Sequence, residues 1–175
     1  MKKYNSGKFI IRFILPFLVI PFLQGCAIQV TLDGASIPEN IRTASVQNFD
    51  NRAAYINPVL TQTFTEGLKD RIINGSRLRL ADGIGDVDFS GEITGYNTEP
   101  LAIQADAVSA ETRLTVRVNV RYENAKDPEE SWESSFTAYR DFPSEQNINA
   151  IEGELMAEIV EELTDNIFNK SFADW

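Results

Sequence analysis

Histidine is absent from this 175-residue sequence, and cysteine occurs once, as Cys26. Without histidine, the chain cannot form serine or cysteine nucleophile systems of the usual kind. Zinc sites built from histidine and cysteine are excluded for the same reason, and a single cysteine has no disulfide partner within the chain. The phosphate-binding motifs G-x-G-x-x-G and Walker A are missing too. The sequence therefore predicts no enzyme activity, no cofactor and no metal.

Carboxylates are the remaining chemistry-bearing groups, and they are plentiful. A glycosidase-like carboxylate pair or a calcium site therefore stays open. None of the acidic clusters has EF-hand spacing, however, and solvated faces and turns are the simpler interpretation. The clusters are Asp82/Asp86/Asp88, Asp127/Glu129/Glu130 and the run from Glu152 to Glu162.

The first 25 residues have the pattern of an export signal. Four basic residues and no acidic residue accompany an apolar run at 13–23, which is shorter than the roughly 20 residues that cross a bilayer. The sequence Leu-Gln-Gly-Cys at 23–26 resembles a bacterial lipobox, and the resemblance implies cleavage before Cys26 and attachment of lipid to its thiol. The alternative is that Cys26 is a small buried hydrophobic residue.

Removal of a signal peptide at 1–25 changes the charge of the chain. It takes away four of the 16 basic residues and none of the 26 acidic ones, which leaves 12 against 26 and a formal charge of −14. Such a chain should not bind nucleic acid, and an anionic bilayer would repel it unless it were anchored. The rest of the chain suffices for one domain, with a lipid-anchored tether at 26–40 and the domain at 41–175.

Alternation of apolar and polar residues indicates a sheet. It predicts strands over 41–49, 87–95, 114–122 and 132–138, with a short strand or strand lead-in over 77–82. A hairpin loop around Asp127-Pro128 joins the last two long strands. The three long runs should form an antiparallel meander, each with one apolar face that needs a cover.

Apolar residues at four-residue spacing predict two helices. The first begins with Asn57 as the N-cap and runs to about residue 73, where Asn74-Gly75 ends it with residues that tolerate positive φ. The second begins at a capping box formed by Asn149 and Glu152. Its apolar stripe consists of Ile151, Leu155, Ile159, Leu163 and Ile167.

These elements predict an α+β fold, a two-layer sandwich with the order β-α-β-β-β-α. The sheet should have four strands and be mixed but mostly antiparallel, with both helices on one face. The first strand would join the sheet as a parallel neighbour through the crossover helix.

The segment 97–111 and the polar face of the sheet can each be interpreted in two ways. The segment 97–111 either extends the flanking strands into a long hairpin or forms a partner-binding loop. On the polar sheet face, Arg117 and Arg121 either pair with the acidic residues of the neighbouring strands, Asp88, Glu92 and Glu133, in a solvated charge ladder, or they form an anion or lipid site together with Arg113.

Longer blocks resemble the lipopolysaccharide-assembly lipoprotein family LptE. They read GASIPENIRTASVQNFDNRAAYINPVLTQTFTEGLKD at 34–70, DFSGEITGY at 88–96, PLAIQ at 100–104 and EIVEELTDNIFNKSFADW at the end. The resemblance implies a lipid-anchored, periplasm-facing protein of the outer membrane that plugs the β-barrel LptD, assists its assembly and takes part in lipopolysaccharide transport. Ala27, rather than Asp, follows Cys26, which favours the outer membrane.

The resemblance also implies site residues. The family's barrel contacts point to Pro100, Leu101 and Ile103. Basic residues near the sheet end imply candidates for lipopolysaccharide binding, namely Arg77, Arg79, Arg113, Arg117 and Arg121. The rival function is a stand-alone periplasmic lipoprotein that binds a lipid or small ligand on its exposed sheet face.

Overall fold

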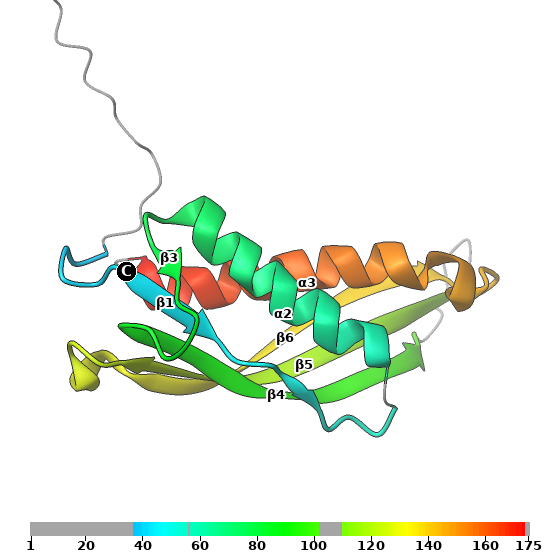
Figure 1. The fold of residues 1–175 in the computed structure, drawn as a ribbon. Helices are drawn as coiled ribbons and strands as arrows, with labels where there is room; N and C mark the ends of the chain where they lie inside the picture. Colours follow the sequence, from blue (N-terminus) through cyan, green and yellow to red (C-terminus); the bar gives the residue numbers. More distant parts are fainter. Residues whose placement is uncertain (1–36, 56, 102–109, 174–175) are drawn as a thin grey trace, which may run out of the picture. The chain divides into compact units, whose positions relative to one another are not determined.

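The structure is a computed structural model, and it describes residues 37–55, 57–101 and 110–173 (Figure 1). The predicted signal peptide, Cys26 and most of the predicted tether lie outside these residues. The described residues belong to one unit, Asp33–Trp175. Their elements, in chain order, are β1 (Thr43–Val46), β2 (Asp50–Asn51), α2 (Pro58–Gly75), β3 (Arg79–Leu80), β4 (Val87–Pro100), β5 (Glu111–Asn124), the 3-10 turn η2 (Pro128–Glu130), β6 (Trp132–Pro143) and α3 (Ile148–Phe172).

The strands form one mixed sheet. Its order is β3-β1-β4-β5-β6, and β2 also pairs with β4. β1 lies parallel to β3 and β4, whereas β4, β5 and β6 form the predicted antiparallel meander. The α+β fold and the parallel crossover from β1 to β4 are therefore confirmed.

The predicted number of four strands is wrong, because the sheet has six. The predicted strand 41–49 ends at Val46, and the chain then bends before pairing again as β2. At the bend, the Phe49 N–H turns away from the sheet and donates to Thr65 Oγ1 of α2 at 3.3 Å. The segment 77–82 contributes the other short strand, β3, which pairs with β1.

Both helices cover the same face of the sheet, as Figure 1 shows. They run in the same direction, since Asn57 at the start of α2 contacts Glu152 near the start of α3, and Arg71 further along α2 pairs with Asp165. Gly67 lies where the helices approach closely, because a Cβ there would come within 2.8 Å of Val160 Cγ1.

The first predicted cap is confirmed and the second is wrong. Asn57 Oδ1 accepts hydrogen bonds from Val59 N–H and Leu60 N–H at 2.9 and 3.3 Å. α3 starts two residues before the predicted box, because Asn147 Oδ1 accepts from the Asn149 N–H at 3.0 Å. The Glu152 carboxylate is held by the sheet and α2 instead of the helix end.

The end of α2 also differs from the prediction. The helix continues through Gly75, which does not have a positive φ, and ends at Ser76 in an extended conformation. The Ser76 hydroxyl donates to Ile72 O at 2.6 Å, which satisfies a carbonyl in the last turn.

The core lies between the sheet and the two helices, and the predicted stripes fill it. The α2 stripe is fully buried and consists of Leu60, Phe64, Leu68 and Ile72. The α3 stripe is buried at Ile159, Leu163 and Ile167, whereas Ile151 and Leu155 are only partly buried. The opposite sheet face carries the alternate, mostly polar side chains of β4, β5 and β6.

Candidate functional site

Three arginines form a row along β5 on the exposed face of the sheet. β5 alternates buried and exposed residues, so Arg113, Arg117 and Arg121 point away from the helices. At about 3.3 Å per residue, neighbours in the row are about 13 Å apart. The strand thus brings together three of the five predicted arginines.

The two outer arginines of the row are paired. Arg113 donates from Nε and Nη2 to the two carboxylate oxygens of Asp141 at 2.7 and 2.8 Å, and its guanidinium lies 3.8 Å from the Tyr139 ring centroid. This contact raises the pKa of Arg113 and lowers the pKa of the Asp141 carboxyl. Arg121 pairs with Glu133 at 3.2 Å. Both are cross-strand pairs between β5 and β6. The Arg121–Glu133 pair belongs to the predicted charge ladder, whereas the Arg113–Asp141 pair was not predicted.

Arg117 in the middle differs from its neighbours. Its Nε donates to Thr137 Oγ1 at 3.3 Å, and among the described residues it makes no ion pair. On its other side the register places Gly95, which has no side chain. Arg117 is therefore the most available cation of the row.

Two predicted members of the ladder pair elsewhere. Asp88 is buried, because it turns toward β1 and accepts hydrogen bonds from Ser45 Oγ and Gln47 Nε2. Glu92 lies 3.8 Å from the guanidinium of Arg52, just after β2. These are corrections to the predicted ladder, and their cause is that β1 and β2 lie beside β4 and supply nearer partners.

Arg77 and Arg79 do not join the row. The sheet order places β1 and β4 between β3 and β5. Arg77 donates from Nη2 to Ile37 O at 2.6 Å, and Arg79 is exposed on β3. The five candidate arginines consequently lie in two separate places.

The hairpin end of β4 and β5 holds the predicted barrel-contacting residues. Pro100 pairs with Thr112 in exposed sheet, and the Leu101 N–H donates to Glu111 O at 2.8 Å. The strands therefore extend into the segment 97–111 from both sides, as in the long-hairpin interpretation. Ile103 lies outside the described residues.

A partly buried polar contact behind this hairpin end was not predicted from the sequence. The Tyr96 hydroxyl donates to Glu152 Oε1, and Asn57 Nδ2 donates to the same oxygen at 3.1 Å. Burial, followed by the contact with Glu152, raises the pKa of Tyr96. The contact joins β4 to the starts of both helices. The sequence placed Glu152 in a capping box with Asn149 and on the acidic face of the helix, and neither pattern indicates the contact with Tyr96.

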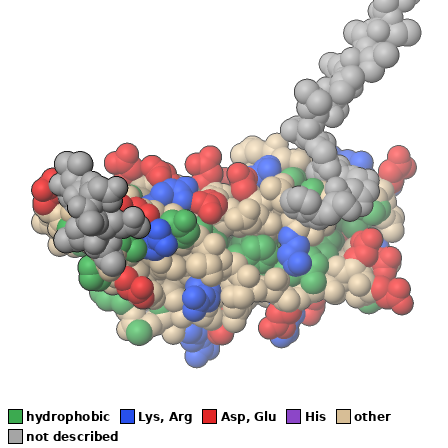
Figure 2. All heavy atoms as spheres, turned by 180° about the vertical axis from the view of Figure 1, so that it is seen from behind, with side chains coloured by type: hydrophobic (Ala, Val, Ile, Leu, Met, Phe, Trp, Pro, Cys, Tyr) green, Lys and Arg blue, Asp and Glu red, His purple; other side chains and the backbone are tan. Residues whose placement is uncertain are grey.

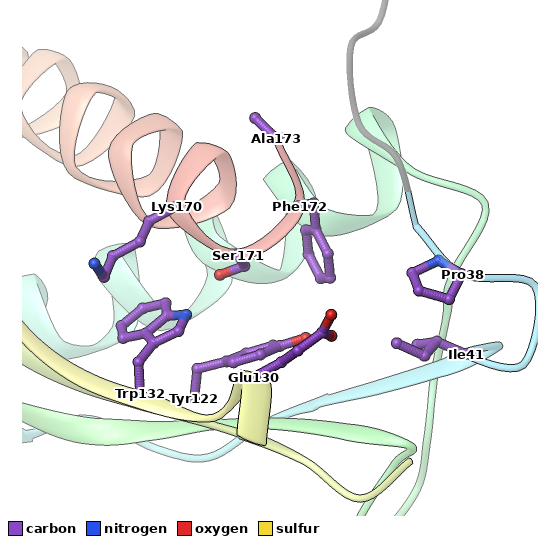
Figure 3. Close-up of a pocket in the computed structure, with 9 residues that line it drawn as sticks. All are labelled: Pro38, Ile41, Tyr122, Glu130, Trp132, Lys170, Ser171, Phe172 and Ala173. Carbon is purple, nitrogen blue, oxygen red and sulfur yellow. The ribbon is translucent and has the colours of Figure 1, made fainter. Parts of the chain in front are cut away.

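A pocket of about 280 Å³ lies at the opposite end of the sheet (Figure 3). Aromatic side chains from β5, β6 and α3 form one side, and Pro38 and Ile41, where the tether meets the domain, form the other. Tyr122 stacks on Trp132 at 5.5 Å, and the Lys170 ammonium lies 5.3 Å from the Trp132 ring centroid. Burial raises the pKa of Tyr122 to about 12. The Trp132 Nε1–H is closed off from solvent and has no acceptor among the described residues.

Metal binding and membrane spanning are two further properties that bear on function. Within residues 37–55, 57–101 and 110–173, no group of histidine, cysteine and acidic side chains has a geometry that would hold a metal ion. In the same part of the chain, neither helix combines the length and the hydrophobicity of a membrane span.

Comparison with known families settles where the chain belongs. The family described as "LptE: Lipopolysaccharide-assembly" matches residues 41–171. The chain belongs to the LptE family. This confirms the resemblance carried by the sequence blocks and covers the sheet and both helices. Among curated proteins, none matches the sequence.

Solved structures that are similar to this LptE-family chain share little sequence with it. Protein XCC0632 from Xanthomonas campestris has a TM-score of 0.54 at 10% identity, with 78% of this chain and 87% of that chain covered. The hypothetical protein CT253 from Chlamydia trachomatis has a TM-score of 0.52 at 11% identity, with 75% and 98% covered. The rare lipoprotein B from Shewanella oneidensis has a TM-score of 0.47 at 16% identity, with 73% and 92% covered.

Proposed function

We propose that this protein is a lipid-anchored, periplasm-facing component of the lipopolysaccharide-assembly machinery at the outer membrane, where it plugs the β-barrel LptD and assists its assembly. The observation that carries the proposal is the LptE-family match over residues 41–171. In this proposal the protein acts by binding and has no catalytic role.

The ends of the sheet fit this role. Pro38, near the end of the tether, and Ile41, at the start of the domain, line the pocket beside Tyr122, near the start of β4. Pro100 and Leu101 lie at the far end of β4, whose 14 residues span about 45 Å. A lipid on Cys26 would thus hold one end of the domain toward the membrane and leave the hairpin end to contact the barrel.

Lipopolysaccharide contact, in this proposal, falls to Arg117. Phosphate groups bind guanidinium groups well, and Arg113 and Arg121 already have carboxylate partners. Arg77 and Arg79, at the other edge of the sheet, would not take part in the same contact.

The partner is tested by isolating the tagged full-length protein from gently solubilised envelopes. We expect LptD to be recovered with it, and we expect Cys26→Ser to lose the acyl mass and the outer-membrane location. Recovery of the wild-type protein as a monomer without any barrel would refute the proposal.

A second candidate function is the binding of a lipid or small ligand on the exposed sheet face. A shallow depression of about 350 Å³ beside Gly91, Arg121 and Glu133 favours it. Native mass spectrometry of the isolated protein decides this point: a retained lipid or small molecule that Arg121→Ala releases would support it, and an empty protein would remove it.

A further inference from the structure

The outer edge of β6 is long and has no strand beside it. β6 pairs with β5 and closes one side of the sheet, and the described residues place no strand beyond it. Its 12 residues exceed the usual five or six of a strand. The opposite edge is β3, which has only two residues. Unpaired backbone groups therefore accumulate on the β6 side.

The register shows which backbone groups face outward. Gln47 N–H donates to Phe89 O at 2.8 Å, so the backbone of Phe89 faces β1. Successive residues alternate in direction, and the β4–β5 and β5–β6 registers carry this alternation across the sheet. Phe89 lies opposite Tyr122, and Tyr122 lies opposite Trp132, so the backbone of Trp132 faces β5. The N–H and C=O groups of Glu133, Ser135 and Thr137 therefore face away from β5.

An independent contact agrees with this assignment and marks where the open stretch ends. Arg140 Nη1 donates to Tyr139 O at 2.8 Å, so this outward carbonyl is already satisfied. The same guanidinium is tied to Glu158 and Glu162 of α3 at 2.7 and 2.5 Å. Proteins commonly protect sheet edges with charged side chains of this kind. Here the protection begins at Tyr139.

The stretch 132–138, which we call the open edge, lacks such protection. It contains no lysine, arginine or proline, and its one charged side chain, Glu133, is tied to Arg121 on the exposed sheet face. Figure 2 views the molecule from behind, with acidic side chains along its upper part and a mixture of hydrophobic, basic and uncharged surface across its middle. The open edge is thus available for pairing.

The side chains of the open edge define what would fit beside it. Trp132 and Phe136 are partly buried on the helix side, with ring centroids 5.8 Å apart. Ser135 and Thr137 are exposed on the other side. A strand placed here would meet apolar rings with one set of alternate side chains and small polar groups with the other.

We propose that the open edge receives an extended strand from another protein, which continues the sheet beyond β6. Only an extended polypeptide offers donors and acceptors that repeat with the spacing of a strand edge. The incoming strand would carry apolar side chains toward Trp132 and Phe136 and polar ones toward Ser135. A second copy of this chain is disfavoured, because each copy has a formal charge of −10 and like charges repel. The proposal does not depend on the barrel being LptD.

Site-specific photocrosslinking in cells tests the pairing. The full-length protein would carry a benzoylphenylalanine probe at Glu133, Ser135 or Thr137 in turn, with a probe at exposed Gln62 of α2 as the control. Strand pairing predicts adducts to one partner segment, with the attachment point moving by two residues from one probe to the next. A stationary or scattered attachment point, an equal adduct from Gln62, or an adduct with twice the mass of this chain would overturn the proposal.

Ser135→Pro and Ser135→Ala form a matched pair for the same experiment. The N–H that proline removes at 135 faces away from β5, so proline there should spare the β5–β6 ladder and block the new pairing. We expect Ser135→Pro to reduce the Thr137 adduct at least tenfold and Ser135→Ala to leave it unchanged. Equal adducts from the two variants would contradict the proposal.

Hydrogen exchange on the unmodified protein gives a second readout that needs no variant to fold. In the isolated protein the amides of Glu133, Ser135 and Thr137 should exchange rapidly, and in the complex captured from envelopes they should slow at least tenfold. If the barrel is captured but these amides stay fast, this proposal fails and the proposed function stands. If the strand that pairs here comes from a protein other than a barrel, this proposal stands and the proposed function fails.

Discussion

Gly91 in β4 offers the sharpest test of the sheet geometry. Among the described residues, Gly91 is the one with a positive φ, +155°. Residues with an L side chain rarely adopt this conformation. A Cβ at this position would lie 2.0 Å from Asn119 O on β5 and 2.8 Å from Phe49 Cε1. Any side chain would therefore force the central strands β4 and β5 apart.

The cost of Gly91→Ala follows from these two facts. The backbone conformation costs an alanine about 1–3 kcal/mol. Moving the Asn119 carbonyl out of overlap weakens a ladder hydrogen bond, which adds about 1 kcal/mol. We expect the free energy of unfolding to fall by about 2–4 kcal/mol, a large share of the stability of about 5–15 kcal/mol that such domains have.

Urea unfolding of the unit Asp33–Trp175, followed by circular dichroism, measures this change. Gly153→Ala is the matched control, because a Cβ there meets nothing within 4 Å and alanine is the better helix former by up to about 1 kcal/mol. The control should be as stable as the parent or more so. A loss below 1 kcal/mol for Gly91→Ala would refute the strand geometry around Gly91.

Three further predictions concern packing and pH. Leu163→Ala should lower the free energy of unfolding by about 2–5 kcal/mol, because Leu163 is fully buried, and Leu155→Ala should cost less; equal losses in urea melts would contradict the helix placement. Hydrogen bonds from the Arg42 N–H, Lys126 and Thr43 hold the pKa of the Asp86 carboxyl well below its usual range. The contribution of Asp86 to the free energy of unfolding is therefore present above pH 3.8 and is lost as pH falls. Asp86→Asn should flatten the acid side of the curve of stability against pH, and an unchanged slope would count against the contact. Burial raises the pKa of Tyr122 to about 12. The contribution of Tyr122 to the free energy of unfolding is therefore present below pH 10 and is lost between pH 10 and 12. Tyr122→Phe should remove that alkaline loss of stability, as thermal melts across this range would show.

The long elements were predictable because their periodic patterns extend over many residues. The alternation around Val116, Val118 and Val120 leaves no helical alternative, and the four-residue spacing from Leu60 to Ile72 predicts a one-sided helix. β2 and β3 have two residues each, which is too short for any periodicity. Their existence depends on neighbours in space and was therefore missed or left uncertain.

The candidate site was only partly predictable for the same reason. The row of arginines follows from spacing within one strand, and β6 supplies Asp141 and Glu133 opposite Arg113 and Arg121. The hydrogen bond from Ser45 to the Asp88 carboxylate, in contrast, forms because β1 lies beside β4. Residue spacing within a strand does not reveal that neighbour. Tertiary contacts, rather than local pattern, decide which charges remain available.

In the proposed function, this LptE-family protein supports the outer-membrane barrel that inserts lipopolysaccharide. Depletion of the protein in its own host, followed by measurement of folded LptD and of lipopolysaccharide at the cell surface, tests this most directly. We predict that both fall together and that Gly153→Ala restores both. Unchanged folded LptD and unchanged surface lipopolysaccharide after depletion would contradict the claim.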